Sequence, residues 1–181
     1  MNIYIPIPDY DNYDRFYPLN QEYAHGILSR FLNFAMYQDI EEKSEWIPLP
    51  VGIKPFSTKR GDFLGVTGWT FACNNRAWKI LEPLIGDSVK LLPLECDKGE
   101  FNILKVINII DCLDYSKADL FRFEETGRVL RIKKHAFKEE LIQEQHFFAV
   151  PECKFGILVS QKFKDLVEES QLKGLKFKQV A

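Results

Sequence analysis

Phe71-Ala-Cys-Asn-Asn-Arg-Ala-Trp-Lys-Ile-Leu-Glu82 is one of two stretches that decide the expected fold, and Ile157-Leu-Val-Ser-Gln-Lys-Phe-Lys-Asp-Leu-Val-Glu168 is the other. Each begins with a short apolar run, passes through a polar residue suited to capping a helix, and continues with apolar side chains at helical spacing. A second strand-like run follows each helix. We therefore predict two β-α-β-like units, over about residues 70–94 and 157–180. An internal duplication and the independent occurrence of a common supersecondary structure explain the two units equally well.

The residues between the two units carry hairpin signals. Asp97-Lys-Gly99 and Glu124-Glu-Thr-Gly127 each separate two apolar runs, as the turns of β-hairpins do. Helices combined with hairpin-connected strands predict an α+β fold, with a largely antiparallel sheet and flanking helices.

The first 58 residues are predicted to form a segment of their own. Ile3, Ile5 and Ile7 alternate as in a strand, and the apolar spacing further on predicts one helix over residues 20–38. The prolines that follow predict a connector. We divide the chain into an acidic N-terminal segment, residues 1–58, and an α+β domain, residues 59–181, which together form one compact unit.

Composition and charge bear on the class of partner. The chain has 181 residues and a net charge of −2, whereas dedicated nucleic-acid binders carry a positive excess, so we expect no nucleic-acid partner. The sequence shows no signal-peptide pattern and no uncharged run long enough to span a membrane. We therefore expect no membrane partner and a cytoplasmic location. Residues 1–50 carry more acidic than basic side chains, which favours a basic partner there.

No pattern in the sequence specifies a catalytic, cofactor or metal site. The four cysteines include no CxxC pair and lie in or beside apolar runs, which is typical of buried, inert thiols. A metal site built from His135, His146 and Cys153 has no usual ligand spacing. A nucleophilic Cys112 activated by His135 is an alternative, although burial would raise the pKa of its thiol. We expect no catalytic residue, no cofactor and no metal.

Carboxylates and tyrosines interleaved near the N-terminus form the candidate partner-binding surface. Acidic groups complement a cationic protein surface, and tyrosines anchor an interface at low entropic cost. The alternative is a packed loop in which the aspartates form turns. The predicted contact residues are Asp9, Tyr10, Asp11, Tyr13, Asp14 and Tyr17.

A short basic run from Arg131 to His135 is predicted to lie on a strand, with Arg131 and Lys133 facing solvent. It suits either a solvated face or contact with an acidic partner. The nearest aromatic residues, Phe121 and Phe123, fit core packing as well as they fit a binding surface.

Several motifs in the last two thirds of the chain carry a resemblance through their order and spacing. They are Asp62-Phe-Leu-Gly, Asn75-Arg-Ala-Trp-Lys-Ile-Leu-Glu-Pro-Leu, Val106-Ile-Asn-Ile-Ile-Asp-Cys-Leu-Asp114, Ile132-Lys-Lys-His-Ala-Phe137, and the ending Leu158-Val-Ser-Gln-Lys-Phe with Gly174-Leu-Lys-Phe. With these motifs, roughly residues 60–180 resemble a bacterial immunity-protein family of polymorphic toxin systems, the eleventh immunity class.

The resemblance implies a non-enzymatic protein that binds and neutralises a cognate toxin protein. It implies no catalytic residue, and it leaves the identity of the toxin and the oligomeric state open. Two alternatives stand beside it. One is an enzymatic or small-molecule-binding domain with a pocket near Cys112 and His135, and the other is a general protein-interaction module.

Overall fold

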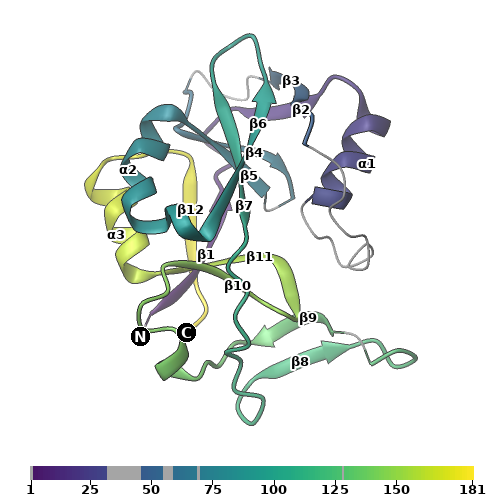
Figure 1. The fold of residues 1–181 in the computed structure, drawn as a ribbon, viewed down its shortest axis with the longest axis vertical. Helices are drawn as coiled ribbons and strands as arrows, with labels where there is room; N and C mark the ends of the chain where they lie inside the picture. The colour runs from purple at the N-terminus through teal and green to yellow at the C-terminus, as the bar shows by residue number, and fades with distance from the viewer. Residues whose placement is uncertain (1, 32–45, 55–58, 69, 128) are drawn as a thin grey trace.

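A computed structural model describes residues 2–31, 46–54, 59–68, 70–127 and 129–181 (Figure 1). The helices are α1 (Gln21–Phe31), α2 (Asn75–Ile85) and α3 (Gln161–Glu169), with two short 3-10 helices, η2 (Gly86–Ser88) and η3 (Glu139–Leu141). The strands are β1 (Ile3–Pro8), β2 (Arg15–Pro18), β3 (Leu49–Lys54), β4 (Phe63–Thr67), β5 (Thr70–Asn74), β6 (Val89–Glu95), β7 (Phe101–Val106), β8 (Asp119–Arg122), β9 (Val129–Lys134), β10 (Phe147–Val150), β11 (Cys153–Ser160) and β12 (Leu175–Gln179).

The strands form three sheets. One has four strands in the order β10-β11-β1-β12, the second is a closed barrel in the order β2-β3-β6-β7-β5-β4, and the third is the β8–β9 ribbon. Neighbouring strands are antiparallel except in two pairs of the barrel, β2–β4 and β3–β6, which are parallel. The predicted α+β class is therefore confirmed, and most strand pairs are antiparallel as predicted, but the strands form three sheets that include a closed barrel rather than a sheet with clearly flanking helices. Closing six strands into a barrel satisfies edges that an open sheet would leave unpaired.

Both predicted β-α-β-like units are present, and both have the same split form. β5 and β6, on either side of α2, each pair antiparallel with β7, which lies between them. β11 and β12, on either side of α3, each pair antiparallel with β1 in the same way. In each unit, the two strands that flank the helix are therefore parallel to one another. One strand from outside the unit lies between them.

The two helices begin at equivalent caps. The side chain of Asn74 accepts a hydrogen bond of 2.9 Å from the backbone N–H of Ala77 at the start of α2. Ser160 Oγ accepts one of 3.2 Å from the N–H of Phe163 at the start of α3. Each cap satisfies one of the N–H groups that a helix terminus leaves without an intrahelical partner.

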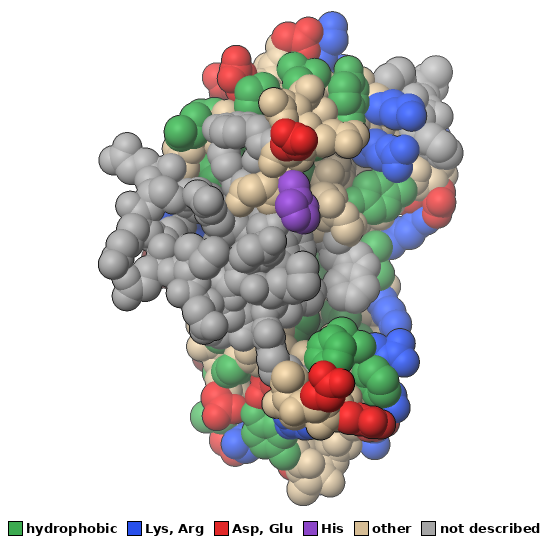
Figure 2. All heavy atoms as spheres, turned by 90° about the vertical axis from the view of Figure 1, so that its right-hand side faces the viewer, with side chains coloured by type: hydrophobic (Ala, Val, Ile, Leu, Met, Phe, Trp, Pro, Cys, Tyr) green, Lys and Arg blue, Asp and Glu red, His purple; other side chains and the backbone are tan. Residues whose placement is uncertain are grey.

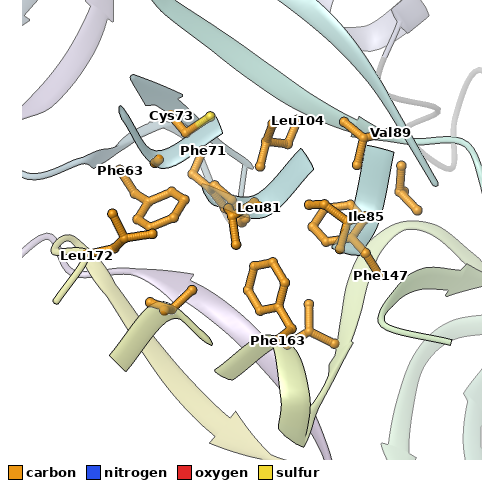
Figure 3. Packing of buried hydrophobic residues seen from close by; sticks show 14 of the residues in the cluster. Phe63, Phe71, Cys73, Leu81, Ile85, Val89, Leu104, Phe147, Phe163 and Leu172 are labelled. Atoms are coloured by element: carbon orange, nitrogen blue, oxygen red, sulfur yellow. The ribbon is translucent and has the colours of Figure 1, made fainter. Parts of the chain in front are cut away.

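The main hydrophobic core lies where the two units meet (Figure 3). Leu81 and Ile85 of α2 point toward Phe163 of α3, with Phe147 beside them. Phe63 and Phe71, from β4 and β5, meet edge to face with ring centroids 5.9 Å apart. Fully burying a side chain of this size contributes about 1.5–3 kcal/mol, so this cluster joins the two units strongly.

Residues near the N-terminus contribute strands to two of the sheets. β1 lies inside the four-stranded sheet, and β2 and β3 belong to the barrel. β3 lies within the stretch whose prolines predicted a connector. Residues 32–45 and 55–58, on either side of this part of the chain, lie outside the described residues. Helix α1 matches the start of the predicted helix 20–38, and residues 32–38 of that prediction also lie outside the described residues.

Two smaller clusters complete the interior. One fills the barrel around Phe16, Leu49, Leu92 and Ile103. The other lies against the four-stranded sheet and includes Cys112 among its buried members. Among the described helices, none has the length and apolar character needed to cross a bilayer.

Candidate functional site

The predicted Asp-Tyr segment, residues 9–17, runs from the end of β1 through a turn into β2. Asp9 is buried, accepts hydrogen bonds of 2.8 and 3.1 Å from the Asn12 amide, and pairs with Lys176 Nζ of β12 at 2.8 Å. Burial acts to raise the pKa of the Asp9 carboxyl, but the hydrogen bonds from Lys176 and Asn12 outweigh it and hold that pKa below its usual value. Asp9 thus fastens the segment to β12.

Asp11 reaches the same lysine from the solvent side. Its carboxylate lies 2.6 Å from Lys176 Nζ, and its side chain is 82% exposed. The hydrogen bonds from Lys176 to Asp11 and Asp9, in that order of importance, raise the pKa of the lysine. Lys176 therefore neutralises part of the negative charge that the sequence placed on this segment.

The tyrosines of the segment pack on glycines of the barrel. Tyr10 covers Gly65, where a Cβ atom would overlap its ring, and its hydroxyl donates a hydrogen bond of 2.7 Å to the carbonyl of Gly68. Burial raises the pKa of Tyr10. Tyr17 covers Gly52 in the same manner but is 45% exposed. Both rings brace β2 and its neighbours.

The six predicted contact residues thus lie together but differ in exposure. Asp14 is buried, and its N–H donates to the carbonyl of Lys59 at 3.4 Å, while Tyr13 is half-buried. Asp11 and Tyr17 are the exposed members, whereas Asp9, Tyr10 and Asp14 are held by contacts within the fold. Sequence alone did not separate the two groups, because Lys176 and the two glycines lie far from the segment along the chain.

Cys112 and His135 occupy different environments. Cys112 is fully buried in the cluster beside the four-stranded sheet, and burial raises the pKa of its thiol to about 11. His135 is half-buried, with its ring centroid 5.8 Å from that of Phe137. A buried thiol with a raised pKa is a poor nucleophile at neutral pH.

His135 instead lines a small cavity between β9 and the four-stranded sheet. The cavity has a volume of about 180 Å³ and a mainly aliphatic wall that includes Ile5, Leu130, Ile132 and Leu158. Cys153 also lines it, and burial raises the pKa of that thiol to about 11. Burial, followed by the nearby charge of Lys178, lowers the pKa of His135. Both groups are therefore mainly neutral near pH 7.

The other histidine of that alternative metal set has a structural partner. His146 Nδ1 lies 2.9 Å from Ser160 Oγ, the oxygen that caps α3. Within the described part of the chain, no group of three or more histidine, cysteine or acidic side chains is arranged to hold a metal ion. His135, His146 and Cys153 are therefore engaged in packing and hydrogen bonds within the fold.

The basic run lies on β9 except for His135, which follows the strand, and Arg131 and Lys133 are exposed as the alternation predicted. Phe121 and Phe123 on the facing strand and turn are also exposed, at 41% and 50%. The sequence left open whether these two rings belong to the core, and the structure places them on the surface. In the sequence, the signal for their exposure was the position of both rings beside basic residues on a predicted hairpin.

Comparison with known proteins identifies one family. Residues 96–181 match the family described as Immunity protein family (Imm11). No curated protein matches the chain. The matched region begins after β6 and includes β7 to β12 with α3, and therefore the β8–β9 hairpin, the second β-α-β-like unit and the lining of the small cavity except Ile5. The resemblance to this immunity-protein family that the sequence predicted is thus confirmed, over residues 96–181 rather than over roughly 60–180.

Proposed function

We propose that this chain is a non-enzymatic immunity protein that binds a cognate bacterial toxin domain and blocks its activity. The observation that carries the proposal is the family match over residues 96–181. The chemistry of the described residues is compatible with it, because burial raises the pKa of the Cys112 and Cys153 thiols to about 11, and a protonated thiol is a weak nucleophile near pH 7.

The four cysteines suit a cytoplasmic protein. Cys73, Cys96, Cys112 and Cys153 are all free, and disulfides are rare in the reducing cytoplasm. We place the proposed inhibitor there, where it would meet a toxin domain entering or made in the cell.

The Asp-Tyr segment is one candidate contact for that toxin. Asp11 and Tyr17 are the predicted residues exposed enough to meet a partner without unfolding the loop. We therefore expect Asp11→Ser with Tyr17→Ala to weaken a contact made by this segment, while leaving the ion pair of Asp9 with Lys176 in place.

Co-expression with the toxin domain encoded beside the gene tests the proposal. Cell survival is scored together with co-purification of the two proteins. An immunity protein must hold its toxin tightly, and nanomolar affinity corresponds to about −12 kcal/mol. Rescue with a stable complex is the expected result. Rescue without a complex would point to chemical inactivation of the toxin and would overturn the non-enzymatic proposal.

A further inference from the structure

The β8–β9 hairpin has one face toward the fold and one toward solvent. Its two strands pair only with each other among the described strands, and the hairpin extends from the body of the molecule, with its turn at the far right of Figure 1. Leu120 and Ile132 are opposite each other in the ladder and pack on the cluster that contains Cys112. This inner contact anchors the hairpin.

The outer face carries an aromatic ring with two cations over it. Phe121 is opposite Arg131 in the ladder, and Lys133 follows two residues later on the same side. The Arg131 guanidinium carbon lies 5.5 Å from the Phe121 ring centroid, and Lys133 Nζ lies 5.0 Å from it. Within the described residues, no carboxylate lies within ion-pair distance of either cation. Cation–π contact orders both groups without neutralising them.

The apolar surface of the hairpin continues to its turn. Phe123 is 50% exposed, and it lines a shallow hollow of about 610 Å³ together with Phe121, Glu124 and Glu125. The turn faces the viewer in Figure 2, where hydrophobic, acidic and basic side chains meet on the lower part of the molecule. Phe121 and Phe123 are the phenylalanines among the exposed large hydrophobic side chains of the described residues. Core packing does not require rings on this outer face, because the inner face already supplies the anchor.

We propose that the outer face of the β8–β9 hairpin is the docking surface for an acidic protein partner, which inserts an apolar side chain between Phe121 and Phe123. This deepens the proposed function, on which it rests for the identity of the partner as a toxin. Carboxylates of the partner pair with Arg131 and Lys133, whose guanidinium and ammonium groups form strong charge-assisted hydrogen bonds.

The charges of the hairpin also determine the orientation of the bound partner. Glu124 and Glu125 at the turn repel carboxylates, so the acidic groups of the partner lie toward Arg131 and Lys133 and its apolar side chain lies toward Phe123. Arg122 is engaged elsewhere, because its Nη1 donates a hydrogen bond of 2.9 Å to the carbonyl of Gly127 and braces the turn.

A single-stranded nucleic acid is the competing occupant, since it also uses basic groups beside aromatic rings. The two glutamates that border the hollow oppose a phosphate backbone, and the chain as a whole has a net charge of −2. The two glutamates restrict an acidic contact to the side of Arg131 and Lys133, which suits a few carboxylates of a protein better than a continuous phosphate backbone.

The test compares charge-reversed proteins of equal net charge. Arg131→Glu with Lys133→Glu removes the proposed contact, and Lys79→Glu with Lys98→Glu is the control at exposed lysines outside the hairpin. Each is measured by surface plasmon resonance against the toxin domain encoded beside the gene. The hairpin variant should associate at least tenfold more slowly at low salt, with a smaller ratio at 0.5 M salt, and the control should stay within twofold of the original. Phe121→Ser should instead accelerate dissociation. Equal rates for both charge-reversed proteins would overturn the inference while leaving the immunity function intact.

A second probe makes the inference independent of that toxin. The random copolymer poly(Glu,Tyr) is acidic and aromatic, and oligo(dT) represents single-stranded nucleic acid. Weaker copolymer binding by the hairpin variant than by the control supports the docking surface even if the neighbouring domain does not bind and the proposed function fails. Equal copolymer binding by all proteins, or tighter binding of oligo(dT) than of the copolymer, overturns it.

Discussion

Asp62 accepts two hydrogen bonds of 2.9 Å, one at each carboxylate oxygen, from Nη1 of Arg76 in the first turn of α2. The same carboxylate accepts a bond of 3.1 Å from the amide of Asn74 and one of 3.0 Å from the backbone N–H of Lys173. Arg76 Nη2 in turn donates to the carbonyl of Ser170, just beyond α3. One carboxylate therefore links the start of α2 to the chain between α3 and β12, so that the two β-α-β-like units share a polar connection above their common core.

Removing the two partners should have unequal effects on stability. The side chain of Asp62 is 11% exposed and that of Arg76 is 54% exposed. We expect Asp62→Ala to lower the free energy of unfolding by about 2–3 kcal/mol, because a buried carboxylate with several hydrogen bonds is lost and the Lys173 N–H is left without its acceptor. Arg76→Ala should cost about 1 kcal/mol or less, because solvent screens an exposed cation. Urea unfolding followed by circular dichroism measures both.

The exposed pair of Lys98 with Asp97, 3.6 Å apart, provides the control for that series. Lys98→Ala should change the free energy of unfolding by less than about 0.5 kcal/mol. If Asp62→Ala is as mild as this control, the carboxylate is not the link between the units that its hydrogen bonds indicate.

Gly174 allows a second test of the same junction. Its φ is +111°, and a Cβ atom there would overlap the carbonyl oxygen of Phe63. We expect Gly174→Ala to destabilise the fold by more than about 2 kcal/mol, because both backbone conformation and backbone contact oppose the methyl group. Thermal unfolding measures the loss.

Gly127→Ala provides a comparison in which only the backbone conformation opposes the methyl group. Gly127 also has a positive φ, +66°, but a Cβ atom there would meet nothing within 4 Å. Its substitution should cost only about 1–2 kcal/mol, the usual penalty for a left-handed non-glycine residue. Equal losses at both positions would show that the contact with Phe63 adds nothing.

Local patterns predicted those parts of the fold that depend on neighbouring residues. The caps at Asn74 and Ser160, the helices after them and the glycine turns at Gly99 and Gly127 all follow from short-range chemistry, and the structure contains each of them. The barrel did not follow, because its closure depends on parallel pairing of β2 with β4 and of β3 with β6. No local hydrophobic period specifies which distant strand is the partner.

The Asp-Tyr segment shows the same limit at the level of single side chains. Its composition is that of an exposed acidic loop, yet Asp9 is buried against Lys176 and Tyr10 covers Gly65. Both partners belong to strands that are remote in sequence. Phe121 and Phe123 are the opposite case, because the sequence allowed them to pack in the core and the structure exposes both rings. Alternation alone does not determine which face of an isolated hairpin contacts the core.

Asp9 should make stability depend on pH in the acidic range. Its pKa is lower in the folded protein than the ordinary aspartate value of 3.8, so its stabilising contribution is complete above that value and is lost as the pH falls through the folded pKa. We therefore expect Asp9→Asn to be destabilising at pH 6, and the difference from the original protein to shrink by pH 2. Urea unfolding at both pH values measures this. Asp11→Asn is the matched control, and it should have a smaller effect at pH 6 because its carboxylate is largely in solvent. A difference for Asp9→Asn that is independent of pH would mean that packing, and not charge, holds the segment.

The cysteines should react with alkylating reagents in an order set by burial. Burial raises the pKa of Cys73 to about 12 and the pKa values of Cys112 and Cys153 to about 11, so these three thiols carry little thiolate at pH 7.5. Cys96, the residue directly after β6, is half-exposed. We expect iodoacetamide to modify Cys96 first in the folded protein, and all four cysteines at similar rates in urea, as followed by mass spectrometry of tryptic peptides. Cys96→Ser should abolish the fast phase. Modification of Cys153 at the rate of Cys96 would show instead that the small cavity beside His135 opens to solvent and activates its thiol, which would strengthen the case for a ligand or substrate at that position.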